Sequence, residues 1–123
     1  MFDNKNKPKG LKRIYLASLN SFRAFRWLFK NESAFRQESL MLAASIPITF
    51  IFNISHAERL ALVISILFVI FTEVINTAIE AIVDRVGLEI HPLSGLAKDL
   101  GSAAVLLSIV ITAGIWLIIL LDK

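Results

Sequence analysis

The sequence contains no cysteine among its 123 residues. This absence excludes a disulfide framework, a thiolate metal site and a cysteine nucleophile. The sequence also lacks the Gly-x-x-x-x-Gly-Lys phosphate loop and the signature motifs of protein kinases. Residue types alone therefore do not assign a nucleotide-dependent reaction to this chain.

Charged residues are scarce over most of the chain, and 56% of its residues are hydrophobic. So short and apolar a chain cannot enclose an ordinary globular core, which makes a lipid bilayer its natural solvent. Residues 101–121 form an uncharged apolar run, and about 20 such residues cross the hydrocarbon layer. Residues 60–83 form a second long run that contains Glu73, Asn76 and Glu80, and residues 39–54 form a shorter one with Pro47 inside.

These runs predict an all-α membrane protein with one domain over residues 1–123. We expect an amphipathic surface helix at about residues 10–30 and three transmembrane helices at 33–54, 58–86 and 94–121. Within the first helix, apolar side chains recur on one side and basic ones on the other, which is typical of a helix lying on an anionic leaflet. The alternative is a soluble amphipathic helix that packs on a partner; nucleic-acid binding is not expected, because the charges decorate an apolar helix.

Basic residues concentrate near the N-terminus and predict the topology. Nine of the thirteen Lys and Arg residues form a basic arm: Lys5, Lys7, Lys9, Lys12, Arg13, Arg23, Arg26, Lys30 and Arg36. The positive-inside rule places this arm and the loop at residues 87–99 in the cytoplasm, and the loop at residues 53–59 outside. Charges interleave with Phe, Leu and Trp in the first thirty residues, so we expect the N-terminus to be retained rather than cleaved as a signal peptide.

Polar side chains within the second long run are the strongest functional signal. Glu73, Asn76 and Glu80 follow spacings of three and four, which places them on one helix face, and Asp84 extends the stripe. Carboxylates within a span cost several kcal/mol unless they face protein or water, which favours a functional role. The alternative is that they form interhelical hydrogen bonds. A helix that starts outside near Arg59 would bring Glu80 to the inner water boundary and Glu73 about two turns deeper.

The predicted cytoplasmic loop adds Glu89, His91, Lys98 and Asp99 beside that boundary. Lys98 could neutralise phosphate charge and Asp99 could orient it. Such residues also serve as interfacial anchors and head-group contacts. The residues by themselves therefore predict a polytopic protein with an acidic site at the inner interface.

The segment EVINTAIEAIVDRVGLEIHPLSGLAKDLGSAAV, residues 73–105, closely resembles the signature region of prokaryotic diacylglycerol kinases. The segment NESAFRQE, residues 31–38, resembles the other marker of that family. The resemblance implies a homotrimer in the cytoplasmic (inner) membrane, with a surface helix and three transmembrane helices per subunit and active sites between subunits. It also implies an ATP-dependent kinase that converts 1,2-diacylglycerol to phosphatidic acid with Mg²⁺.

The resemblance further implies roles for individual residues. Glu73 matches the general base, supported by Asn76, and Glu32 and Glu80 match the magnesium ligands. The residues that match nucleotide contacts are Arg13, Asn20, Glu32, Glu80, Glu89, His91, Lys98 and Asp99. Those that match lipid contacts are Arg13, Ser21, Phe22, Arg36, Glu73 and Ser102.

Three positions depart from the family pattern. Asn20 stands where a family Tyr can stack near the nucleotide, Phe22 replaces a Trp, and Leu96 stands where some members have Arg. The first leaves open how adenine is held. An undecaprenol kinase of the same family would use the same site, and a non-enzymatic membrane subunit is the alternative from another class.

Overall fold

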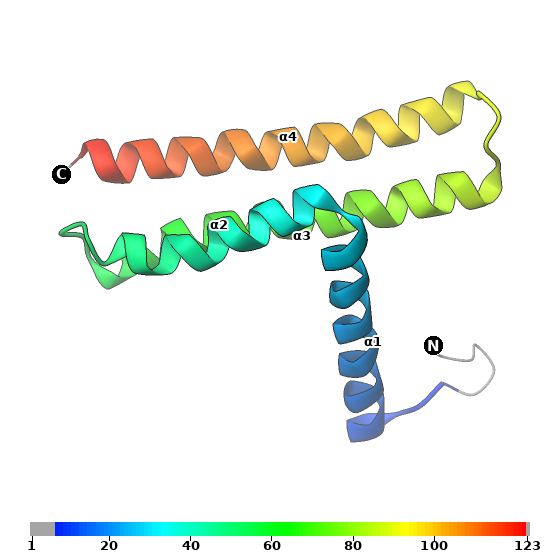
Figure 1. The fold of residues 1–123 in the computed structure, drawn as a ribbon, viewed down its shortest axis with the longest axis horizontal. Helices are drawn as coiled ribbons and strands as arrows, with labels where there is room; N and C mark the ends of the chain where they lie inside the picture. The colour runs from blue at the N-terminus through cyan, green and yellow to red at the C-terminus, as the bar shows by residue number, and fades with distance from the viewer. Residues whose placement is uncertain (1–6, 123) are drawn as a thin grey trace. The chain divides into compact units, whose positions relative to one another are not determined.

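The structure, a computed structural model, describes residues 7–122, which form four helices and no strand (Figure 1). The helices are α1 (Gly10–Asn31), α2 (Ser33–Thr49), α3 (His56–Val86) and α4 (Pro92–Leu121). The prediction of an all-α fold is therefore confirmed for these residues. Lys5 of the basic arm lies outside the described part. The chain divides into two compact units, residues 1–36 and residues 37–123.

The first unit contains α1, whose bounds agree closely with the predicted surface helix. Its first residue, Gly10, has a φ of 68°, a left-handed conformation that glycine adopts without strain. At the other end, Glu32 is extended and its backbone N–H donates to the Leu28 carbonyl at 2.8 Å. Large apolar side chains remain exposed along α1, among them Leu11, Ile14, Tyr15 and Phe22. This exposure fits a helix that needs a lipid surface or a partner to cover its apolar side.

Helix α2 ends at Thr49, five residues before the end predicted at residue 54. Pro47 lies inside its last turn, and a proline lacks the N–H that would continue the ladder of hydrogen bonds. The backbone then tightens, since Phe50 N–H bonds the Pro47 carbonyl at 3.1 Å and Ile51 N–H bonds the Ile48 carbonyl at 3.0 Å. With 17 residues, α2 rises about 25 Å, so a third transmembrane helix stays a prediction.

Helices α3 and α4 each begin two residues before the predicted start, and both starts have a local cause. Ser55 caps α3 through a capping box in which its side chain accepts from Glu58 N–H at 3.1 Å, while Glu58 Oε1 accepts from Ser55 N–H at 3.0 Å. His91 caps α4, and Pro92 occupies the first turn, where its missing N–H costs nothing.

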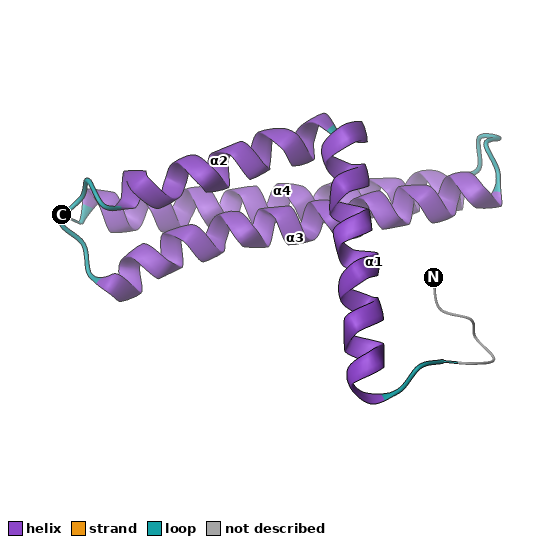
Figure 2. Ribbon diagram, turned by 60° about the horizontal axis from the view of Figure 1, so that its bottom comes forward, coloured by secondary structure: helices purple, strands orange, loops and turns teal. Residues whose placement is uncertain are grey.

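Helices α3 and α4 pack side by side and run in opposite directions (Figures 1 and 2). Among the described residues, these two helices are long and apolar enough to cross a membrane. Only 6% of the most apolar stretch of α4 is buried, so α4 is not the core helix of a soluble single chain. Its apolar surface requires lipid or other protein chains around it.

Candidate functional site

The acidic stripe predicted on α3 is present, and it runs from a buried end to an exposed end. Glu73 and Asn76 are each only 8% exposed, although both are polar. Glu80, one turn further along, is half-buried, and Asn76 Nδ2 donates to its Oε1 atom at 3.3 Å. The helical spacing of three and four residues therefore places these side chains together, as the sequence predicted.

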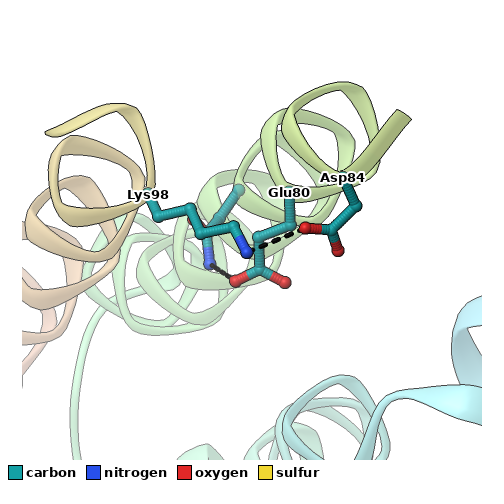
Figure 3. A network of polar contacts seen from close by, with 4 residues as sticks. Glu80, Asp84 and Lys98 are labelled. Carbon is teal, nitrogen blue, oxygen red and sulfur yellow. Dashed lines mark hydrogen bonds and ion pairs between the residues drawn. The ribbon is translucent and has the colours of Figure 1, made fainter. Parts of the chain in front are cut away.

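Lys98 joins the exposed end of this stripe from α4. Its Nζ atom forms an ion pair with Asp84 Oδ1 at 2.8 Å (Figure 3). Lys98 also interacts electrostatically with Glu80. The Lys98 and Asp84 side chains are 45% and 50% exposed, so a water-soluble ligand can reach them. An exposed pair of this kind adds little to stability, which leaves Lys98 available to exchange Asp84 for another anion.

Gly101 brings α4 unusually close to the stripe. It is buried, and a Cβ atom at this position would collide with Asn76 Oδ1. Asn76 Oδ1 is itself buried and accepts no hydrogen bond from any described residue. A buried acceptor without a partner is uncommon in folded proteins, and at this position the Gly101 backbone occupies the space beside it.

The donor atoms at this end of α3 suit a magnesium ion. Glu80 offers a half-buried carboxylate, whereas Asn76 Oδ1 is buried against Gly101 and is not open to an ion. Mg²⁺ prefers one or two carboxylates together with phosphate oxygens and water. Residues 7–122 contain no cluster of three or more His, Cys, Asp or Glu side chains that could hold a metal by itself. The residues therefore fit an ion that arrives with phosphate rather than a preformed cage.

Glu38 is a candidate residue to which sequence reasoning gave no role. It lines a largely apolar cavity of about 570 Å³ formed by residues of α2, α3 and α4, with Trp116 also on its wall. The Glu38 carboxylate interacts with the charge of Glu73, and its Oε2 atom is buried without a hydrogen-bond partner among the described residues. The sequence did mark Glu38, since it is the last residue of the family-like segment NESAFRQE, but that segment does not predict a contact with Glu73.

Three residues predicted to contact lipid share one surface hollow in the first unit. Arg13, Ser21 and Phe22 line it on one side of α1. Asn20 does not line this hollow and is half-buried. Arg36 also has a structural contact, because its Nη1 atom donates to the Phe29 and Lys30 carbonyls at 2.9 and 3.0 Å, and its predicted lipid contact stays a prediction. Arg36 therefore satisfies carbonyl groups at the end of α1.

The remaining predicted residues lie in or after the loop at residues 87–91. His91 Nδ1 accepts a hydrogen bond from Leu93 N–H at 3.1 Å, so its ring caps α4. Glu89, Asp99 and Ser102 are exposed. Their contacts with nucleotide or lipid, and that of His91, stay predictions, and so does the pairing of Glu32 in the first unit with Glu80 in the second.

Comparison with known proteins gives one consistent result. The family model for prokaryotic diacylglycerol kinase matches residues 19–120. The diacylglycerol kinase of Escherichia coli strain K12 is 41% identical over 115 residues, which cover 94% of this chain and 94% of that protein. The diacylglycerol kinase of Pseudomonas aeruginosa is 44% identical over 112 residues, 91% of each chain. That of Haemophilus influenzae is 38% identical over 110 residues, 89% of this chain and 93% of that one.

Proposed function

The chain belongs to the prokaryotic diacylglycerol kinase family, and we propose that it transfers the γ-phosphoryl group of MgATP to 1,2-diacylglycerol, forming phosphatidic acid. The proposed reaction takes place at the cytoplasmic face of the inner membrane. The family supports the acceptor, since each of the compared relatives is named a diacylglycerol kinase.

One observation carries the proposal: the polar stripe on α3 changes from buried to exposed along its length. Glu73 is 8% exposed, whereas Asp84 beside Lys98 is 50% exposed. A lipid hydroxyl can meet a carboxylate at the buried end, and a water-soluble nucleotide can meet Lys98 at the open end. One helix face can therefore bind a lipid at its buried end and a water-soluble nucleotide at its exposed end.

Glu73 is the base in this proposal. It accepts the proton of the lipid hydroxyl as the hydroxyl oxygen bonds to the γ-phosphorus and the bond from that phosphorus to the bridging oxygen of ADP breaks. Lys98 neutralises negative charge on the phosphate oxygens, and Asn76 orients Glu80 through its amide hydrogen bond. The magnesium ion of MgATP, held by Glu80 and Glu32, would withdraw charge from the phosphates.

The remaining contacts complete the proposal. Arg13, Asn20, Glu89, His91 and Asp99 contact the nucleotide, and Arg13, Ser21, Phe22, Arg36 and Ser102 contact the lipid. The apolar side of α1 and its basic residues favour the cytoplasmic leaflet. The exposed apolar surface of α4 favours a homotrimer whose subunits complete each site.

A phosphorylation assay tests this function. Purified chain in mixed micelles with radiolabelled MgATP should convert diacylglycerol to phosphatidic acid, with undecaprenol tested at the same surface concentration. Glu73→Gln should lower kcat by roughly 10²-fold or more, because the amide cannot accept the proton.

Glu58→Gln is the matched control on the same helix. Glutamine also completes a capping box, so this variant should keep kcat near that of the unmodified chain. A higher kcat/KM with undecaprenol would show that the lipid acceptor is undecaprenol rather than diacylglycerol, and the assignment as a lipid kinase would stand. Absence of product from both lipids, with a verified oligomer, would favour a structural membrane subunit.

A further inference from the structure

A line of hydroxyl groups joins α3 to α4, and the proposed chemistry uses none of them. Thr72 Oγ1 and Ser108 Oγ are 3.0 Å apart, with side chains 9% and 0% exposed. Two turns earlier in α3, Ser65 receives two bonds from α4. Thr112 Oγ1 donates to the Ser65 carbonyl at 2.9 Å, and Trp116 Nε1 donates to Ser65 Oγ at 3.1 Å.

The Thr72 and Ser108 hydroxyls depend on each other. Thr72 Oγ1 also lies 2.8 Å from the Val69 carbonyl, and Ser108 Oγ lies 2.6 Å from the Val105 carbonyl. Each hydroxyl has one proton, so one hydroxyl donates within its own helix while the other donates across to its partner. The bond between helices therefore requires a narrow range of separations of α3 and α4 and of rotations of α3 about its axis.

Thr72 directly precedes Glu73, the proposed base. Their side chains leave α3 about 100° apart, so the rotation that Thr72 fixes also sets the direction of Glu73. A carboxylate about 6 Å from the helix axis moves by about 1 Å when the helix turns by roughly 10°. A displacement of about 1 Å at a reacting group can cost up to about 100-fold in rate.

We propose that Thr72 and Ser108 are positioning residues, whose mutual hydrogen bond holds the rotation of α3 and thereby places the Glu73 carboxylate at the lipid hydroxyl. This inference deepens the proposed function and rests on it. Thr112 also bonds across to α3, about two turns away from Glu73, but its hydroxyl meets two backbone carbonyls, that of Ser65 at 2.9 Å and that of Ser108 in its own helix at 2.8 Å. Thr112 provides the comparison that separates positioning from stabilisation.

The experiment compares hydroxyl deletions in the full-length chain with diacylglycerol and MgATP both varied. Thr72→Val keeps the side-chain shape and should lower kcat about three- to tenfold, with the KM for MgATP unchanged. Ser108→Ala should have a similar effect, and the double variant should lose no more than the stronger single variant, since both remove one bond. Thr72→Ser restores the hydroxyl and should restore kcat.

Thermal denaturation in the same micelles provides the second measurement. Thr112→Val should lower the denaturation temperature without lowering kcat. Equal losses of kcat in Thr72→Val and Thr112→Val would overturn the inference, as would an unchanged kcat in Thr72→Val. If Thr72→Val does not fold, Ser108→Ala decides in the same way. An inactive unmodified chain would overturn the proposed function as well, whereas an active chain with unaffected variants would overturn this inference alone.

Discussion

Replacement of Gly101 by alanine tests the close approach of α4 to the acidic stripe. The added Cβ atom would collide with Asn76 Oδ1 and would lie 3.2 Å from Asn76 Cγ and 3.6 Å from Ile79 Cδ1. Ordinary contact with Ile79 is harmless, so the collision with Asn76 decides the outcome. Either the Asn76 amide turns away or the two helices move apart.

Both responses disturb the proposed site. A turned amide loses its 3.3 Å bond to Glu80, and overpacking of a tight contact costs about 1–3 kcal/mol. We expect Gly101→Ala to lower the free energy of unfolding by about that amount and kcat by about tenfold. Thermal denaturation in detergent and the phosphorylation assay measure the two effects.

Two other glycines of α4 provide matched controls. A Cβ atom at Gly95 or Gly114 would have no neighbour within 4 Å. Alanine at these positions should therefore leave kcat unchanged and stabilise the helix by about 0.5–1 kcal/mol. If Gly101→Ala proves as stable and active as Gly95→Ala, Gly101 does not lie as close to Asn76 as the structure places it. The argument that Gly101 sets the orientation of the Asn76 amide would then also be refuted.

The other predictions concern charge and assembly. Glu80→Gln and Glu32→Gln should each raise the magnesium concentration needed for half-maximal activity, because each removes a hard oxygen anion. An unchanged midpoint of the magnesium titration in both variants would exclude Glu80 and Glu32 as magnesium ligands. Asp84→Asn should leave kcat nearly unchanged and alter the KM for MgATP, since it releases Lys98 from its ion pair; an unaltered KM would argue that Lys98 does not contact the nucleotide. Mixed oligomers of Glu32→Ala and Glu73→Ala chains should recover activity if these acids come from different subunits, and no recovery in verified mixtures would favour self-contained sites.

The positions of helices were predictable from the sequence where the pattern of hydrophobic residues determines them. The long apolar runs gave α3 and α4 to within two residues at each end, and the helical spacing placed Asn76 beside Glu80. The errors at helix ends come from local chemistry. The Ser-x-x-Glu capping box at Ser55 was readable in the sequence, whereas the early end of α2 depends on how the chain resumes after Pro47.

Contacts between helices were not predictable from the same patterns. A serine or threonine in an apolar helix can bond its own backbone or a neighbouring helix, so the sequence does not distinguish Thr72, which pairs with Ser108, from a residue that only bonds within its turn. His91 and Arg36 illustrate the same point. The family resemblance implies ligand contacts for both, which stay predictions, and in the chain by itself their side chains bond backbone carbonyl or N–H groups at helix ends.

The unsatisfied atoms of the chain indicate where the site is incomplete. Asn76 Oδ1 and Glu38 Oε2 are both buried without a hydrogen-bond partner among residues 7–122. Leaving such groups unpaired costs about 1–3 kcal/mol each, and more when the group is charged. Glu38 lines a cavity, so a hydroxyl, an ammonium group or a metal ion supplied by a substrate or a neighbouring subunit would remove that cost at Glu38. Because Glu38 interacts with Glu73, binding of such a partner would act through Glu38 on the carboxylate assigned to proton transfer.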